Sequence, residues 1–302
     1  MKFCFILAIV GILWVACAHT PAQKTEKDMA ELQIRLQQEI TAAHAEVGLA
    51  LQDLASGHQI LINAKQLMHA ASTMKVPVMI EVFKQAEQGK FSLDDSLVVQ
   101  NEFHSIVDTS LYSLSAEDDS DQEIYRLIGK KSTVRELIFK MITVSSNLAT
   151  NQLVELVGAK NIRTTLSELG VHNMQVLRGV EDGKAHRQGL NNVTDAYDLM
   201  LVMAAIAEGK VGSQAACREM IRILSAQTFR SAIPTGLPAG VQVVNKTGSI
   251  PGVVNHDAAI VFPPGQPPYV LVVLTRGITE DKKAKALIAK LSQIIYQEIV
   301  GG

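Results

Sequence analysis

A serine and a lysine stand three residues apart in the segment Ser72-Thr73-Met74-Lys75, at the start of a helical pattern. Residues three apart in a helix share one face, so the Lys75 amine can reach the Ser72 hydroxyl. An unassisted serine is a poor nucleophile at neutral pH, and a nearby amine with a depressed pKa can accept its proton. The helix N-terminus also offers N–H donors to a developing oxyanion. The pair therefore suits acyl transfer through a covalent serine intermediate.

Two further short motifs follow in the chain, Ser145-Ser146-Asn147 and Lys246-Thr247-Gly248. A Ser-x-x-Lys or a Ser-x-Asn arises by accident about once in a chain of this length, and a Lys-Thr-Gly about once in twenty such chains. Their context adds information, because the first motif opens a predicted helix, the second lies between helical segments and the third ends a predicted strand. The combination points to one site built from three parts of the chain.

The elements that must position these motifs are strands near both ends of the chain and helices between them. Amphipathic helices are predicted over residues 26–43 and from about 284 to 299. We therefore predict an α/β (α+β) fold, in which one antiparallel five-stranded sheet is flanked by the N- and C-terminal helices and carries an inserted all-helical domain. The five predicted strands are residues 47–54, 60–63, 241–247, 254–262 and 269–276.

The predicted division of the chain has three parts. Residues 1–18 form a signal peptide, residues 25–72 and 211–302 form the α/β sheet domain, and residues 73–210 form the all-helical domain. No strand pair is expected within the helical domain. The acidic stretch 116–123, which carries five carboxylates, is interpreted as a solvated surface loop without a role.

The first residues have the pattern of a secretory signal, with Lys2, an apolar run over 3–15 and the small-residue triplet Ala16-Cys17-Ala18. The run is shorter than the roughly 20 apolar residues that cross a bilayer. Residues 15–17 also resemble a bacterial lipoprotein box, so cleavage after Ala18 and a lipid anchor at Cys17 both stay open. We expect an exported protein of the periplasm or cell envelope, without a membrane span.

Composition excludes several classes of partner and site. Hydrophobic residues make up 47% of the chain and the net charge is -2, which gives no long-range attraction for nucleic acid. Only Cys217 lies in the predicted folded body, so no intrachain disulfide is expected. The eight histidines show no metal-ligand spacing such as His-Glu-x-x-His. We expect no cofactor, no metal and a monomer.

The three motifs together resemble the active-site serine family of class A β-lactamases and penicillin-binding proteins. The resemblance covers nearly the whole mature chain. It implies that Ser72 is acylated by a lactam carbonyl, that Lys75 takes part in proton transfer and that Ser145 passes a proton to the departing nitrogen. The substrate-binding groups that it implies are Asn147 for the side-chain amide, Lys246 and Thr247 for the carboxylate, Gly248 for close approach, and the N–H groups of Ser72 and Ser249 for the oxyanion.

The chain departs from the class A pattern where the family places its deacylating glutamate, in a Glu-x-x-Leu-Asn sequence. Glu181 lies thirty-six residues after Ser145 and follows Arg178, which matches the usual arginine of that loop, but no Leu-Asn follows it. The resemblance implies Glu181 as the base that activates water; a surface glutamate in a turn is the alternative. Ser146 stands where class A enzymes commonly have aspartate.

A second departure concerns the arginine that often helps to bind the substrate carboxylate, because Asn255 stands at the expected position. If Phe262 pairs with Tyr269 across the proline-rich turn, Asn255 lies opposite Arg276. We predict that Arg276 supplies the missing charge. His69 and His256, which flank these motifs, are interpreted as packing or structural hydrogen-bond groups.

These features predict a class A serine β-lactamase that confers antibiotic resistance. It would open the lactam ring of penicillins and cephalosporins through a Ser72 acyl-enzyme and release the product with water activated by Glu181. Two alternatives use the same nucleophile: a DD-peptidase or esterase, and a penicillin-binding sensor that stays acylated.

Overall fold

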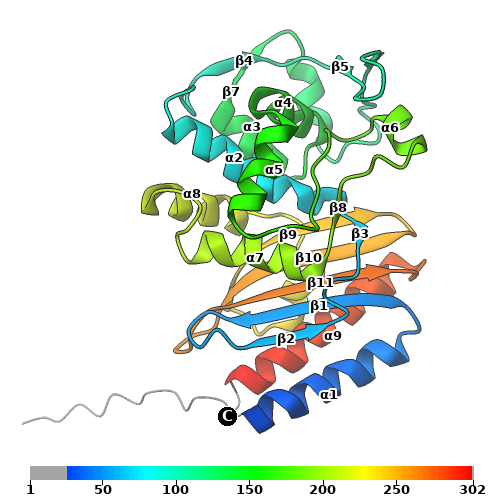
Figure 1. Cartoon of the computed structure of the whole chain (residues 1–302), viewed down its shortest axis with the longest axis vertical. Coiled ribbons are helices and arrows are strands. Elements are labelled where there is room, and N and C mark those ends of the chain that lie inside the picture. Colours follow the sequence, from blue (N-terminus) through cyan, green and yellow to red (C-terminus); the bar gives the residue numbers. More distant parts are fainter. Residues whose placement is uncertain (1–25, 301–302) are drawn as a thin grey trace, which may run out of the picture.

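The computed structural model describes residues 26–300, in which a five-stranded sheet lies between a pair of helices and a larger helical layer (Figure 1). The predicted signal peptide and Cys17 lie outside the described residues. Every helix in the described range is too short or too polar to cross a bilayer.

The sheet has the strand order β2-β1-β11-β10-β9, and every neighbouring pair is antiparallel. Strands from the two ends of the sequence lie side by side, because β1 pairs with β11 along its whole length. The predicted five-stranded antiparallel sheet is confirmed. Its strands are β1 (Glu46–Asp53), β2 (Gln59–Ile62), β9 (Gln242–Ile250), β10 (Val254–Phe262) and β11 (Tyr269–Arg276).

One face of the sheet is covered by the helices nearest the two ends of the chain, α1 (Glu26–Ala42) and α9 (Asp281–Val300) (Figure 1). Both helices carry apolar residues at spacings of three and four, so each presents one apolar stripe. Leu36 of α1 and Leu291 of α9 are fully buried in the same core as Leu271 of the sheet. The predicted flanking helices therefore pack together on one face.

The opposite face is covered by α7 (Ala196–Ala207), which packs against β1, β10 and β11. Because both faces are covered, almost every residue of the central strands β10 and β11 is buried. Above α7 lies the rest of the helical layer (Figure 1). It contains α2 (Lys75–Glu87), α3 (Val134–Thr143), α4 (Asn147–Val157), α5 (Ala159–Glu168), α6 (Gly183–Arg187) and α8 (Gln214–Ser225).

The predicted helical domain also contains short strands, so the expectation of no strand pair there is wrong. Pairs of two or three residues are too short to show the alternation that predicts a strand. The domain boundaries by residue number stay a prediction. Two pairs lie within the predicted helical domain, β4 (Ser96–Val98) with β7 (Lys131–Thr133) and β5 (Phe103–His104) with β6 (Leu111–Tyr112), and a third, β3 (Met68–His69) with β8 (Val193–Thr194), joins it to the predicted sheet domain.

A short 3-10 helix, η3 (Ile233–Gly236), is locked between α9 and the sheet. The Ile233 N–H donates to Asp257 of β10 at 3.0 Å, and the Ile233 carbonyl accepts from Ser292 of α9 at 3.1 Å. A Cβ atom at Gly236 would overlap the Ala289 carbonyl oxygen of α9. Only glycine therefore lets η3 lie this close to the helix.

Gly236→Ala should lower the free energy of unfolding by about 1–3 kcal/mol, because α9 or η3 must move to admit the methyl group. Denaturant titration of the folded protein measures the loss. Gly183→Ala is the control, because the added carbon would meet only the flexible end of Arg187. Equal stability of the two variants would contradict the role given to Gly236.

Candidate active site

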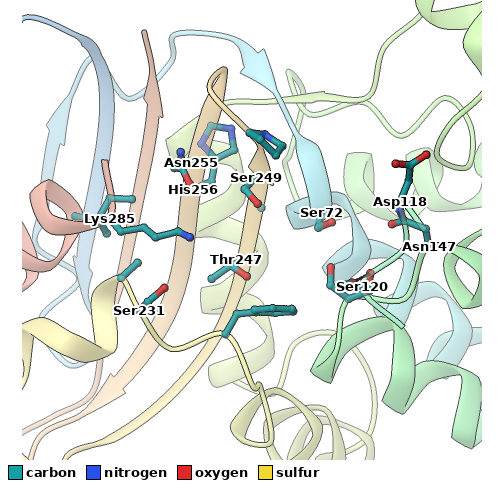
Figure 2. Close-up of a pocket in the computed structure, with 16 residues that line it drawn as sticks. Ser72, Asp118, Ser120, Asn147, Ser231, Thr247, Ser249, Asn255, His256 and Lys285 are labelled. Atoms are coloured by element: carbon teal, nitrogen blue, oxygen red, sulfur yellow. Dashed lines mark hydrogen bonds between the residues drawn. The ribbon is translucent and has the colours of Figure 1, made fainter. Parts of the chain in front are cut away.

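A cavity of about 290 Å³ opens where strand β9 faces the start of α2 and the turn before α4 (Figure 2). Its walls bring together the three sequence motifs, although they lie far apart in the chain. Ser72 lies on the wall next to the helical layer, and Thr247 lies on β9 opposite (Figure 2). Ser145, Asn147, Gly248 and Ser249 also line it.

Ser72 lies on η1 (Ala71–Met74), a 3-10 turn that leads directly into α2. In a 3-10 helix, residues three apart are eclipsed, so Ser72 and Lys75 project to the same side. Ala71 has a left-handed φ of 45°, and its N–H donates to His69 Nδ1 at 3.0 Å. The Ser72 hydroxyl has no hydrogen-bond partner among the described residues and lines the cavity. It is therefore free to meet a ligand.

Lys75 is fully buried, and its ammonium group makes three hydrogen bonds. Nζ donates to the Ser145 carbonyl at 2.6 Å, to Asn147 Oδ1 at 2.8 Å and to Ser145 Oγ at 3.2 Å. Burial lowers the pKa of Lys75 to about 7, although the carboxylates of Asp119 and Glu181 oppose the shift. Lys75 can therefore act as a base near neutral pH.

Lys246 reaches the same hydroxyl from the sheet and is also fully buried. Its Nζ donates to Ser145 Oγ at 3.0 Å and to the Thr247 carbonyl at 2.9 Å. Burial, and then the charge of Lys75, hold the pKa of Lys246 well below its ordinary value. A hydroxyl has two acceptor sites and one donor. Because the two lysines occupy both acceptor sites, the Ser145 O–H is directed to another group, such as a ligand nitrogen in the cavity.

Glu181 lies beside the cavity and is hydrogen-bonded to the last residue of the Ser145-Ser146-Asn147 motif. Asn147 Nδ2 donates to Glu181 Oε1 at 2.6 Å. The Glu181 backbone is left-handed, with φ 62°. Burial raises the pKa of Glu181, the bond from Asn147 opposes this, and the charges of Asp119 and Asp118 add to it. Glu181 and Ser72 line a second hollow of about 440 Å³. A water molecule held there would lie between a base and the nucleophile.

The loop around Glu181 is held by Arg178 and Asn192. Asn192 accepts from the Leu177 N–H at 2.8 Å and donates to the Arg178 carbonyl at 3.0 Å. Arg178 Nε donates to the Leu190 carbonyl at 2.9 Å. These two side chains therefore fix the loop backbone, and both line the hollow that Glu181 shares with Ser72.

Strand β9 passes so close to η1 that a side chain at Gly248 would fit only if its neighbours shifted. A Cβ atom at Gly248 would lie 3.1 Å from the Ser72 nitrogen and 3.0 Å from the Thr73 methyl group. Ser249, the next residue on β9, lines the cavity beside Ser72. The lack of a side chain at Gly248 lets β9 pass next to η1, and this brings the backbone of Ser249 to the side of the cavity where the oxyanion donors are expected.

The predicted pairing of Asn255 with Arg276 is wrong. Val261, not Phe262, pairs with Tyr269, so Asn255 lies opposite Thr275 and Arg276 lies opposite Val254. Arg276 forms an ion pair with Glu46, and its Nε donates to Glu46 Oε1 at 3.1 Å. Arg276 lines a different surface hollow and not the cavity of Ser72. The geometry therefore gives no support to Arg276 as a carboxylate ligand.

A cation that the sequence analysis missed does face the cavity. Lys285 of α9 extends toward Thr247 and Ser249 (Figure 2) and lines the cavity with Ser231. It forms no ion pair with the described residues. Lys285 lies three residues before Ile288, which lines the same cavity. Residues three apart share one face of a helix, so this spacing could have placed Lys285 beside the apolar face of α9. The neighbouring lysines of α9 obscured it.

The two histidines have structural hydrogen bonds. His256 is buried, its Nε2 lies 2.9 Å from the His69 carbonyl, and its Nδ1 accepts from the Thr275 N–H at 3.2 Å. Burial lowers the pKa of His256 to about 4. Within residues 26–300, no group of three or more His, Cys, Asp or Glu side chains is placed to hold a metal ion.

The acidic stretch is not wholly solvated, contrary to its interpretation as a surface loop. Asp119 is 3% exposed and Asp121 is 7% exposed. Asp121 forms an ion pair with Lys140 at 3.0 Å, and Asp119 lies against the first residues of α4. Nothing in the local sequence distinguishes these two carboxylates from their exposed neighbours.

Known proteins share this sequence pattern and fold. The chain is 24% identical over 288 residues to a β-lactamase of Streptomyces fradiae, covering 93% of this chain and 90% of that protein. Among solved structures it is similar to PBP-A, with 25% identity and a TM-score of 0.76; the match covers 89% of this chain and 96% of PBP-A. The structure of a β-lactamase of Chitinophaga pinensis is 22% identical, with a TM-score of 0.77; the match covers 88% of this chain and 98% of that protein. Because the profile of the Beta-lactamase enzyme family matches residues 31–299, the chain belongs to that family and has its fold.

Proposed function

We propose that this chain is a serine β-lactamase that hydrolyses penicillins or cephalosporins through an acyl-enzyme on Ser72. One observation carries the proposal: Lys75 and Lys246 both donate to Ser145 Oγ, at 3.2 and 3.0 Å, beside the cavity that Ser72 lines. This arrangement supplies a nucleophile, a base of lowered pKa and a hydroxyl relay at one place. The predicted export of the chain would bring it to its substrate outside the cytoplasm.

Acylation begins when Ser72 Oγ attacks the lactam carbonyl carbon and its proton passes to neutral Lys75. The backbone N–H groups of Ser72 and Ser249 stabilise the oxyanion. As the ester bond forms, the lactam C–N bond breaks and the departing nitrogen takes the proton of the Ser145 hydroxyl. Lys75 then returns a proton to Ser145 Oγ across their 3.2 Å hydrogen bond, so the proton count closes.

Deacylation is assigned to Glu181. Its carboxylate takes a proton from water, and the water oxygen attacks the ester carbonyl carbon. The C–O bond to Ser72 then breaks, Ser72 Oγ takes the proton that Glu181 removed from water, and an open-ring acid leaves. The bond from Asn147 and the hollow shared by Glu181 and Ser72 support this role.

A second candidate function is a penicillin-binding protein that acylates but releases the product slowly. It is favoured by the similarity to PBP-A and by the absence of Leu-Asn after Glu181. A point mutant of PBP-A, 26% identical to this chain, has been solved as an acyl-enzyme complex with penicillin G. The two functions differ only in the fate of the acyl-enzyme.

Wild-type protein mixed with a chromogenic cephalosporin should give sustained turnover. Glu181→Gln should slow deacylation by about 10²–10⁴-fold, because a general base is lost, and intact-mass spectrometry should show the trapped adduct. Ser72→Ala should form no adduct. Glu117→Gln is the matched control, because Glu117 is exposed and lines neither hollow.

A single stoichiometric burst by the wild type would support the penicillin-binding protein instead of the lactamase. Cleavage of D-alanyl peptides without lactam turnover would indicate the DD-peptidase. Complete lack of acylation at Ser72 would refute the proposal.

The acylation rate should depend on pH through Lys75. Burial lowers the pKa of Lys75 to about 7, and only the neutral amine accepts the Ser72 proton. The rate should therefore rise with pH up to about 7, level off above it and fall about tenfold for each pH unit below. Stopped-flow acylation rates between pH 5 and 9 measure this, and a rate independent of pH over that range would exclude Lys75 as the base.

Lys285→Ala should reduce kcat/KM for anionic lactams by about 3- to 5-fold, the value of a partly exposed charge pair. Arg276→Ala is the matched control and should leave kcat/KM unchanged, because Arg276 is paired with Glu46 away from the cavity. Steady-state kinetics with benzylpenicillin compare the two. A loss of kcat/KM in Arg276→Ala but not in Lys285→Ala would show that Arg276, and not Lys285, binds the substrate carboxylate.

A further inference from the structure

Asp119 is a buried carboxylate that the mechanism above does not use. Its side chain accepts hydrogen bonds from the Asn147 N–H, 3.0 Å from each oxygen, and from the Leu148 N–H at 2.9 Å. The Tyr125 hydroxyl donates to it at 3.2 Å. No lysine or arginine of the described chain forms an ion pair with Asp119. A buried aspartate is rare without a cation beside it, so the burial of Asp119 needs a physical explanation.

Asp119 occupies the N-terminus of α4, where a carboxylate is favoured by the free N–H groups and the helix dipole. Ser146 is the N-cap residue of α4, and its hydroxyl accepts only from the Ala149 N–H, at 3.3 Å. The Asn147 and Leu148 N–H groups, which Ser146 does not bind, donate instead to the Asp119 carboxylate. The carboxylate at the start of α4 is therefore supplied by a distant loop and not by the N-cap residue itself.

The residue next to Asp119 holds the other side of the same turn. Ser120 Oγ donates to the Val144 carbonyl at 2.6 Å and to the Ser145 carbonyl at 3.2 Å. Ser145 itself has a left-handed backbone with φ 59°, which a residue with a side chain rarely adopts. Asp119 and Ser120 together clamp residues 144–148 in the conformation that points Ser145 Oγ at both lysines.

The charge of Asp119 also acts on the buried base. The charged groups that face Lys75 are the carboxylates of Asp119 and Glu181 and the ammonium of Lys246. The Asp119 carboxylate raises the pKa of Lys75 against the effect of burial, and its negative charge raises the pKa of Glu181. Removing this charge should therefore lower the pKa of both groups.

We propose that Asp119 is a positioning residue, which holds Asn147 and the Ser145 turn in place and balances the charge of Lys75. The role rests on the proposed acylation of Ser72. It predicts that an uncharged residue of the same shape changes the pH dependence of the site and not merely the stability of the fold.

The test compares Asp119→Asn with Asp121→Asn. Asp121 is the matched control because it is also buried in the same stretch but pairs with Lys140, and its backbone N–H, which donates to Asp119 Oδ1 at 3.0 Å, is kept in the variant. The pH at which acylation reaches half its maximum should move down by about one unit in Asp119→Asn. The maximum rate should also fall, because Asn147 loses part of its support. Asp121→Asn should leave the pH midpoint where the wild type has it.

A second measurement does not depend on acylation. In protein labelled with ¹³C-lysine, the Lys75 Cε signal, assigned with Lys75→Met, reports the titration of the amine directly. A folded Asp119→Asn protein whose Lys75 titrates as in the wild type would overturn the inference, and so would an equal shift in Asp121→Asn. Wild-type protein that no lactam acylates would instead overturn the proposed function, while the NMR titration would still decide the role of Asp119.

Discussion

The burial of two lysine amines against one hydroxyl is the constraint on which the rest of the site depends. A charged amine removed from water is costly unless oxygen acceptors surround it. Lys75 finds three acceptor atoms on Ser145 and Asn147, and Lys246 finds two on Ser145 and Thr247. These acceptors belong to the helical layer and to the sheet. Separating the two layers would break the Lys246–Ser145 hydrogen bond and leave the buried Lys246 amine with the Thr247 carbonyl alone, so a contact that prepares the chemistry also joins the two layers at the cavity.

The unusual backbone of the site follows from this constraint. Among the described residues, six non-glycine positions have a left-handed φ, and three of them, Ala71, Ser145 and Glu181, surround Ser72. Such conformations persist only where neighbouring contacts fix them. Hydrogen bonds to His69, Ser120 and Asn147 hold these segments. Half of the left-handed non-glycine positions of the described residues therefore lie where the reacting groups must converge.

The strands were predictable because each is a run of apolar residues bounded by turns, and the final helix was predictable from its apolar stripe. The register of β10 against β11 was not, because the proline-rich turn does not show which residues pair first. A slip of one residue moves every side chain to the other face, and the interpretation of Arg276 failed for that reason. Asp119 could not be found because its partners lie 28 and 29 positions further along the chain.

Asn147 connects the two halves of the proposed reaction. Its amide oxygen accepts from Lys75 at 2.8 Å, and its amide nitrogen donates to Glu181 at 2.6 Å. The opposite orientation would place the NH₂ group against an ammonium and the oxygen against a carboxylate, so the two neighbours fix the orientation of the amide. Glu181 lacks the asparagine that follows it in class A enzymes; hydrogen bonds with neighbouring side chains fix its loop, and the bond from Asn147 orients its carboxylate. Acylation and deacylation therefore share one side chain, and anything that displaces Asn147 disturbs both.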